Sequence, residues 1–230
     1  MNENSEPITE CIACGGKDLH QILDLGVQPL ANSYKINRDD AELTFPLSVM
    51  KCSDCHHVQL STKVNPDLLF KHYLYVSGTA PSQHKYMDWF SGYAIEKHER
   101  MPYSVLDIGC NDGTQLDYFK SKGIETYGVD PAENLLPTSS EKHKVVCGYF
   151  TGEEFPKVLF DIIVCQNAFA HNFDQLQLLK NIKKVMNNNS KLFVTTSQAD
   201  MIKNGEFDTI YHEHLSFYNI LSMSKLCERA

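Results

Sequence analysis

Residues 104–116, SVLDIGCNDGTQL, decide the fold of this chain. A short apolar run ends at Gly109, the polar loop CNDG follows, and residues 114–123 read as a helix that Gly123 stops. Further strand-like runs lie at 124–130, 144–148, 160–167 and 191–197. Helical segments separate them, one from about Ala132 and an amphipathic one at 173–186. This alternation predicts an α/β fold, a mostly parallel sheet with helices on both faces.

The loop at 107–113, DIGCNDG, indicates the ligand, because parallel sheets bind ligands at the carboxyl ends of their strands. It is neither a G-x-G-x-x-G loop nor a phosphate-binding P-loop. Gly109 lets a ligand approach closely, whereas Asp107 and Asp112 favour a cation or amine and would repel a pyrophosphate. Asp130 ends the second strand, where an acid can accept both hydroxyls of a ribose.

A ribose, a cationic end and no phosphate together describe S-adenosylmethionine. The alternative is that Asp112 only caps a helix and Asp130 only ends a strand, with neither binding a ligand.

Composition narrows the function further. The 230 residues are 42% hydrophobic and 22% charged, which suits a folded protein with a sizeable core rather than a disordered one. No run reaches the ~18 apolar residues that span a membrane. The net charge of -8, without a basic cluster, argues against nucleic acid as a partner. The polar, acidic start lacks the pattern of an export signal, so a cytoplasmic, reducing location is expected.

Four of the eight cysteines form two C-x-x-C pairs, Cys11 with Cys14 and Cys52 with Cys55. In a reducing compartment such pairs indicate a metal rather than disulfides. Four sulfurs in a tetrahedron suit a closed, structural Zn²⁺ site that does no chemistry. His56 or His57 could replace a cysteine, although a histidine in that position more commonly lies on the surface. Between the pairs, 24–34 (DLGVQPLANSY) is expected to form a loop and 43–52 a strand; the alternative is four unliganded thiols.

Several long stretches resemble the S-adenosylmethionine-dependent sugar C-methyltransferases of deoxysugar pathways. They are DLGVQPLANSY, both C-x-x-C pairs, VQLSTKVNPDLLF, YLYVSGTA, VLDIGCNDGTQL, GVDPAEN, NAFAH and FDTIYHEHLSFY. The resemblance implies a zinc-binding domain (1–70), a connecting helical segment (71–100) and a Rossmann-like class I methyltransferase domain (101–230). It also implies a nucleotide-sugar substrate, and donor-binding roles for Asp107, Gly109, Asn111, Asp112, Asp130 and Asn167.

The same resemblance gives a role to YHEH. Its histidines are two apart, unlike the H-E-x-x-H of zinc proteases. Matched residue by residue, Tyr211, Glu213 and His214 fall on acid/base positions, and His212 receives no role. His214 is expected to deprotonate a carbon beside the ketone of a 4-keto-6-deoxy sugar, with Glu213 orienting it or supporting its imidazolium. Tyr73 or Tyr75 is expected to stabilise the enolate; the alternative for each of these residues is a structural role.

Two departures from the family affect these expectations. TTSQAD at 195–200 replaces an acidic, proline-containing stretch of the relatives, and Asp107 stands where many have Glu. The chain also ends in the helix after YHEH, without the family's C-terminal domain, so 191–197 is expected to be an edge strand prone to self-association. Alternative functions are a methyltransferase acting on RNA and a non-catalytic module that binds S-adenosylmethionine or zinc.

Overall fold

The computed structural model describes residues 4–230 and divides them into two compact units. Unit 1 contains residues 4–69, Ala170–Leu179 and Thr196–Ala230, and unit 2 contains Phe70–Phe169 and Lys180–Thr195. The YHEH motif therefore belongs to the same unit as the four paired cysteines, and the DIGCNDG loop belongs to the other.

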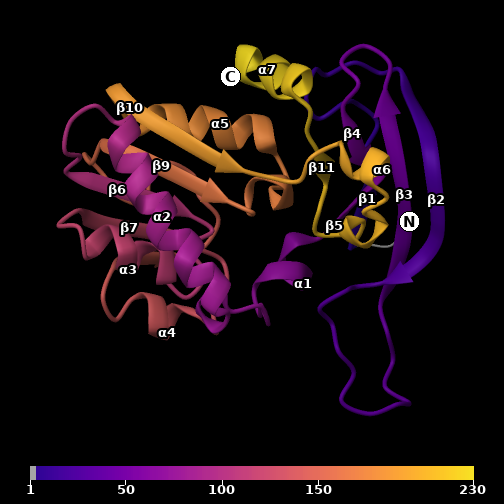
Figure 1. Cartoon of the computed structure of the whole chain (residues 1–230). Helices are drawn as coiled ribbons and strands as arrows, with labels where there is room; N and C mark the ends of the chain where they lie inside the picture. Colours follow the sequence, from indigo (N-terminus) through magenta and orange to yellow (C-terminus); the bar gives the residue numbers. More distant parts are fainter. Residues whose placement is uncertain (1–3) are drawn as a thin grey trace. The chain divides into compact units, whose positions relative to one another are not determined.

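Unit 1 is built on antiparallel strands (Figure 1). Its four-stranded sheet has the order β11-β4-β3-β2, and β1 pairs with β5 in a separate ribbon. The strands are β1 (Ser5–Pro7), β2 (Leu19–Pro29), β3 (Thr44–Cys52), β4 (Val58–Leu60), β5 (Thr62–Val64) and β11 (Ser216–Phe217). The helices are α1 (Pro66–Phe70), α6 (Met201–Asn204), η3 (Phe207–Thr209) and α7 (Ile220–Arg229).

The stretch 24–34 is only partly the expected loop. Its first half continues β2 to Pro29, and the connection to β3 begins at Leu30 and extends from the sheet (Figure 1). Gly26 has a φ of +70° and lies in a register shift against β3 between Asp24 and Val27. A glycine in the left-handed region accommodates such a bulge, so β2 continues through a stretch rich in turn residues.

Unit 2 contains the parallel sheet that the sequence predicts. Five strands pair in the order β10-β9-β6-β7-β8, all in parallel. They are β6 (Ser104–Ile108), β7 (Glu125–Asp130), β8 (Lys144–Cys147), β9 (Phe160–Gln166) and β10 (Met186–Thr195). The helices are η1 (Ser77–Thr79), α2 (Pro81–Lys97), α3 (Thr114–Lys120) and α4 (Leu136–Ser139). Two more helices are shared with unit 1, η2 (Phe169–His171) from Ala170 on and α5 (Gln175–Lys184) as far as Leu179.

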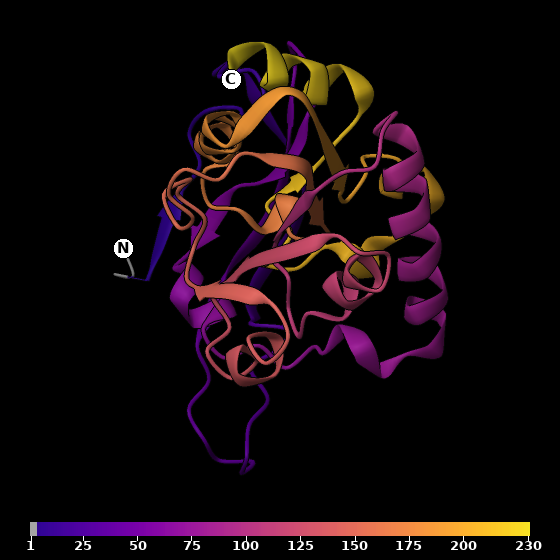
Figure 2. The ribbon, with the colours of Figure 1, turned by 90° about the vertical axis from the view of Figure 1, so that its left-hand side faces the viewer.

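Both faces of this sheet are covered, as expected for parallel strands. Figure 2 shows α2 and α5 on opposite sides of the strands. Phe90 of α2 and Phe119 of α3 pack with Val105 and Val164 in one core cluster. All five residues of β6 are buried, so its apolar run reflects burial on both faces.

Two helix predictions in unit 2 differ from the structure. The helix expected from about Ala132 is the short α4, which starts at Leu136. Asp130 explains the delay, because its Oδ1 accepts the Ala132 N–H and turns the chain after β7. The helix expected at 173–186 ends at Lys184, and β10 already starts at Met186, with an irregular register before Lys191.

Strand β10, which contains most of the expected edge strand 191–197, is the first strand in the order of the parallel sheet. Among the residues that the structure describes, it pairs only with β9. None of the described helices is long and apolar enough to cross a membrane.

Candidate functional site

The two C-x-x-C turns have the same backbone design. The fifth residue of each turn, Gly15 or His56, donates its N–H to the carbonyl of the first cysteine, at 2.8 Å and 3.1 Å. Both residues have a positive φ, 78° and 57°. Cys11 and Cys52 each donate their own N–H to the carbonyl of the sixth residue. Each turn therefore holds its two sulfurs on one side.

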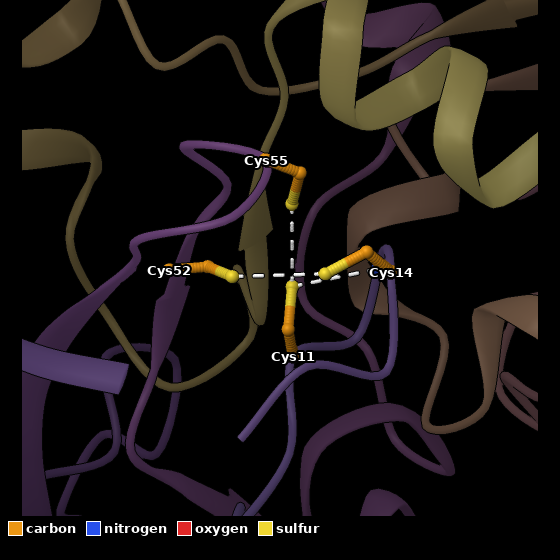
Figure 3. A group of neighbouring side chains, drawn as sticks. All are labelled: Cys11, Cys14, Cys52 and Cys55. Carbon is orange, nitrogen blue, oxygen red and sulfur yellow. Dashed lines mark hydrogen bonds between the residues drawn. The ribbon is translucent and has the colours of Figure 1, made fainter. Parts of the chain in front are cut away.

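The four sulfurs fit a tetrahedral metal site. Cys11, Cys14, Cys52 and Cys55 come from the two turns, and their Sγ atoms lie within 4.8 Å of one another (Figure 3). Two cross-turn pairs, Cys11 with Cys55 and Cys14 with Cys52, are each 3.6 Å apart. Zinc bonded to four sulfurs at ~2.3 Å requires sulfur separations of ~3.8 Å. The spacing therefore suits Zn²⁺ and is too long for disulfides.

The pKa values of these thiols show how burial affects their ionisation. Burial raises the pKa of Cys11, and it raises the pKa of Cys55 to about 11. Burial acts in the same direction at Cys14, but hydrogen bonds, first that from the Gly16 N–H, lower its pKa overall. Buried thiolates without a cation are unfavourable, and Zn²⁺ would supply the compensating charge while displacing the protons.

The two histidines after the second turn differ in burial. His56 is exposed, as expected. The expectation of a surface position is wrong for His57, which is fully buried, packs against the Tyr218 ring at 4.7 Å and hydrogen-bonds Ser216 Oγ through Nε2 at 3.1 Å. Burial lowers the pKa of His57 to about 3, so it is a neutral core residue.

The expected donor-binding residues of unit 2 lie at or just after the carboxyl ends of β6, β7 and β9. Gly109 has a φ of +80°, and a Cβ there would lie 2.4 Å from Ala168 Cβ, so only glycine fits. Asp130 accepts the Asn111 N–H on Oδ2 and the Ala132 N–H on Oδ1, both at 2.8 Å. These contacts hold the carboxylate at the end of β7 and leave each oxygen further acceptor capacity for a ribose.

Asn111 and Asp112 also bind the segment before α2. Asn111, at a φ of 52°, donates from Nδ2 to the Tyr75 carbonyl and accepts the Ser77 N–H, both at 2.9 Å. Asp112 accepts the Gly78 N–H at 2.9 Å and the Thr114 N–H at 3.1 Å. Asp112 therefore binds the first N–H of α3, as the structural alternative predicts, and also orders the Tyr75–Gly78 segment.

Asp107 is the buried acid of this loop. It is 3% exposed, and burial, with a contribution from the Asp130 charge, raises its pKa to about 8. A buried acid of this kind favours a positively charged group of a bound ligand. Asn167, at the end of β9, is exposed, has a φ of 54° and donates its N–H to the Thr195 carbonyl at 2.8 Å.

Tyr73 and Tyr75 belong to the same unit as the donor loop. Tyr73 exchanges two hydrogen bonds with the Asn134 side chain through its backbone, at 2.9 Å and 2.8 Å. Tyr75 is 47% exposed. Both residues are thus fixed through their backbones, and the contacts do not favour one over the other.

The YHEH motif lies on a turn between η3 and β11 of unit 1, not on a helix. The His214 N–H closes the turn on the Tyr211 carbonyl at 3.0 Å. After the turn, Leu215 binds Leu60 through its carbonyl and Ala170 through its N–H, each at 3.0 Å. His212 is buried with its Nε2 3.3 Å from the Phe45 carbonyl.

Both ring nitrogens of His214 have hydrogen-bond partners. Its Nδ1 lies 2.8 Å from the Thr209 carbonyl, which can only accept, so Nδ1 carries the proton and Nε2 has the lone pair. Nε2 accepts a hydrogen bond from the Tyr211 hydroxyl at 3.0 Å. Burial lowers the pKa of His214, partly offset by the Thr209 contact, and burial together with Glu213 raises the pKa of Tyr211. The neutral imidazole is therefore the stable form at neutral pH.

Three partners of this turn could not be assigned from the sequence. Thr209 acts through its backbone carbonyl, which no residue type reveals. Asn32 donates from Nδ2 to Glu213 Oε1 at 2.6 Å, and the ring of His171 lies 5.0 Å from that of His214. The only sequence signals were two stretches of the family resemblance without an assigned role, DLGVQPLANSY and NAFAH.

The structure thus brings the expected site residues together in three groups. The four cysteines form one, Tyr211, Glu213 and His214 the second, and both lie in unit 1. The donor-binding residues and the two candidate tyrosines of the Y-x-Y stretch form the third, in unit 2.

Comparison with known proteins finds two family matches, and the second includes the YHEH turn that the structure places in unit 1. Residues 11–70 match a family described as "Putative zinc binding domain", and residues 77–230 match the family "Methyltransferase domain". Both matches agree with the expected cofactors, zinc at the cysteine cluster and S-adenosylmethionine in the methyltransferase domain.

The matches to individual relatives cover only part of each relative's length. The chain is 31% identical to the C-methyltransferase NovU of Streptomyces niveus, over 99% of this chain and 57% of that protein. A tRNA U34 carboxymethyltransferase of Campylobacter concisus is 27% identical over 55% of this chain and 48% of that protein. The chain therefore spans about half the length of these curated relatives.

Among solved structures, the plantazolicin methyltransferase BpumL with S-adenosylhomocysteine gives a TM-score of 0.49 at 18% identity, covering 66% of this chain and 58% of that one. This likeness is too slight to add to the family matches.

Proposed function

Because the chain belongs to the methyltransferase-domain family and carries a zinc-binding domain at its front, we propose that it methylates carbon in a nucleotide-linked 4-keto-6-deoxy sugar. The likeness to a C-methyltransferase over almost the whole chain supports carbon as the acceptor. The sugar class rests on the sequence resemblance. The net charge of -8 weighs against RNA as the substrate.

The observation that carries the proposal is the pair of hydrogen bonds at the His214 ring, from which its tautomer is inferred. Its Nδ1–H is held by the Thr209 carbonyl and its Nε2 lone pair is available once the Tyr211 hydroxyl moves aside. A neutral, oriented imidazole is the group needed to remove a proton from a carbon beside a ketone near neutral pH. A structural histidine with both nitrogens bonded to fixed backbone groups could not do this.

In the proposed reaction, His214 Nε2 takes the proton and the carbon–hydrogen electron pair becomes an enolate. Tyr73 or Tyr75 stabilises the enolate oxygen by donating a hydrogen bond. When bound, S-adenosylmethionine would supply the methyl group: the enolate carbon bonds the methyl carbon as the sulfonium C–S bond breaks, which leaves S-adenosylhomocysteine. Glu213 supports the imidazolium until His214 returns its proton to water.

Each remaining residue has a binding role. Asp130 accepts the ribose hydroxyls, and Asp107 lies opposite a positive group of the donor. Gly109, Asn111, Asp112 and Asn167 shape the loops around it. The four cysteines hold zinc, which fixes the two turns and takes no part in the reaction.

Replacement of His214 by Gln tests the base. We expect exchange of the substrate's alpha proton with deuterated water to fall by about 10²–10⁴-fold, with the affinity for S-adenosylmethionine nearly unchanged. His20→Gln, at an exposed histidine of the same unit, is the control and should exchange at the parent rate. Exchange by His214→Gln at the parent rate would mean that another group is the base.

Mass spectrometry identifies the substrate. The protein is incubated with S-adenosylmethionine and a panel of 4-keto nucleotide-sugars, and a gain of one methyl group on the sugar is expected. Methylation of RNA and of none of these sugars would contradict the proposal.

A further inference from the structure

A side chain of the zinc-binding part reaches the YHEH turn. Asn32 follows β2, and its Nδ2 lies 2.6 Å from Oε1 of Glu213, 181 residues further along the chain. Glu213 is 2% exposed and Asn32 is partly buried. The contact therefore forms within unit 1, mostly away from water.

The chemistry of this contact is specific to an amide. A carboxylate withdrawn from water needs hydrogen-bond donors, and a short bond to an ionised oxygen is among the stronger ones. The Asn32 amide provides an N–H at the required position. Aspartate has the same shape but no N–H, and alanine has neither shape nor donor.

The surrounding backbone holds Glu213 in place for this contact. On one side of it, His212 lies against the Phe45 carbonyl of β3, and on the other, the Leu215 carbonyl accepts the Leu60 N–H of β4. Strand β11 then pairs with β4, which pairs with β3, and β3 with β2 up to Pro29. Asn32 thus follows the last paired residue of the strand ladder that carries the YHEH turn.

The Glu213 charge acts on Tyr211, whose hydroxyl hydrogen-bonds His214. We propose that Asn32 is a positioning residue of the acid/base cluster: its amide fixes the Glu213 carboxylate and, through it, the Tyr211–His214 pair. This proposal rests on the proposed function of His214. It assigns to DLGVQPLANSY a role in catalysis, although that stretch lies between the cysteine pairs and contributes no ligand to the metal.

Asn32→Ala is the first test. We expect the rate of alpha-proton exchange to fall about tenfold, the effect of losing one hydrogen bond to a charged group, with donor affinity and zinc content unchanged. The matched control is Asn37→Ala, which removes an amide–carboxylate contact with Asp40 in the same connection. That exposed contact lies outside the cluster, so this variant should exchange at the parent rate.

Two further variants separate positioning from packing. Asn32→Asp preserves the shape and removes the donor, so it should lose at least as much rate as Asn32→Ala; full activity of Asn32→Asp would overturn the proposal. In a Glu213→Gln background, Asn32→Ala should cost little more, because Asn32 acts through Glu213. Fully additive losses would also overturn it.

A measurement without substrate keeps this proposal distinct from the proposed function. In nuclear magnetic resonance spectra, the ring resonances of His214, assigned with His214→Gln, should shift in Asn32→Ala and stay in place in Asn37→Ala. If the parent protein exchanges the alpha proton of no 4-keto sugar, the proposed function fails. In that case, unshifted His214 ring resonances in Asn32→Ala would overturn the positioning role of Asn32 as well. Shifted resonances would support that role for whatever reaction His214 performs.

Discussion

The cysteine cluster and the YHEH turn lie in the same unit but are assembled differently. The cluster consists of four identical groups in two C-x-x-C pairs, and all four candidate metal ligands are side chains that the motif displays. The turn depends on partners that are distant in sequence or that act through the backbone, such as Asn32 and the Thr209 carbonyl. A site can therefore be predicted from the sequence when the motif itself contains all of its ligands. It cannot be predicted fully when residues distant in sequence or backbone groups orient its side chains.

The largest expected effect tests the cluster as a self-contained site. Cys52→Ser should lose most of its zinc and destabilise unit 1 by several kcal/mol, because metal binding contributes about 10–16 kcal/mol to the folding of small zinc domains. Cys147→Ser, at an exposed cysteine of unit 2 outside the cluster, should keep one zinc per chain. Elemental analysis with thermal unfolding measures both. If the parent protein, purified without chelator, contains no stoichiometric zinc, the cysteine cluster is not a zinc site.

The second prediction concerns the donor loop. Asp130→Ala should weaken S-adenosylmethionine binding by ~1–3 kcal/mol, the cost of leaving the ribose hydroxyls without their acceptor. Isothermal calorimetry measures the change. Glu133→Ala, a change of a nearby exposed acid, serves as the control. Equal affinity in Asp130→Ala and the parent would place the donor elsewhere and return Asp130 to a structural role.

The third prediction concerns Asp107, whose pKa is raised from its ordinary 3.8 to about 8. A cationic donor favours the ionised carboxylate, so affinity should rise about tenfold between pH 7 and pH 9. Asp107→Asn should lose this dependence, while titration of the donor itself affects both proteins alike. Titration calorimetry at several pH values measures it, and the same slope in both proteins would show that Asp107 does not face the cation.

Stability without the donor should show the opposite dependence on pH. The folded protein holds the Asp107 proton more tightly than the unfolded chain does, so its stability is highest below the ordinary pKa and falls as pH rises from 3.8 toward about 8. Asp107→Asn should remove this part of the fall. Melting temperatures across the range provide the measurement, and an unchanged pH profile in the variant would contradict the assignment.

How much the sequence could reveal follows from the same comparison. The parallel sheet is confirmed because its apolar strands are buried on both faces and alternate with helices in the sequence. The start of α4 could not be predicted. The helix begins at Leu136 rather than near Ala132, because the Asp130 side chain accepts the Ala132 N–H. Similarly, nothing in the spacing of His57 distinguishes it from exposed His56; only the tertiary contact with Ser216 does.

The smallest expected effect asks how far Tyr211 takes part in the chemistry of its neighbour. Its hydroxyl donates to His214 Nε2, a contact that favours the neutral imidazole. Tyr211→Phe removes this donor, so the pKa of His214 should rise toward its ordinary value by up to about one unit, since a neutral hydrogen bond is worth about 0.5–1.5 kcal/mol. In a plot of exchange rate against pH, the inflection on the acidic side should move to higher pH by the same amount. Tyr34→Phe, at a tyrosine that is 76% exposed in the same unit, should leave the profile unchanged.

The plateau of that profile decides between two roles for Tyr211. If the hydroxyl only occupies Nε2 until substrate arrives, the rate above the inflection should stay within a few-fold of the parent, because the base and its Thr209 contact remain. A hundredfold loss on the plateau would mean that Tyr211 itself transfers a proton or holds the enolate. That outcome would make the turn more like the cysteine cluster, a site whose chemistry is carried by the side chains that its motif displays.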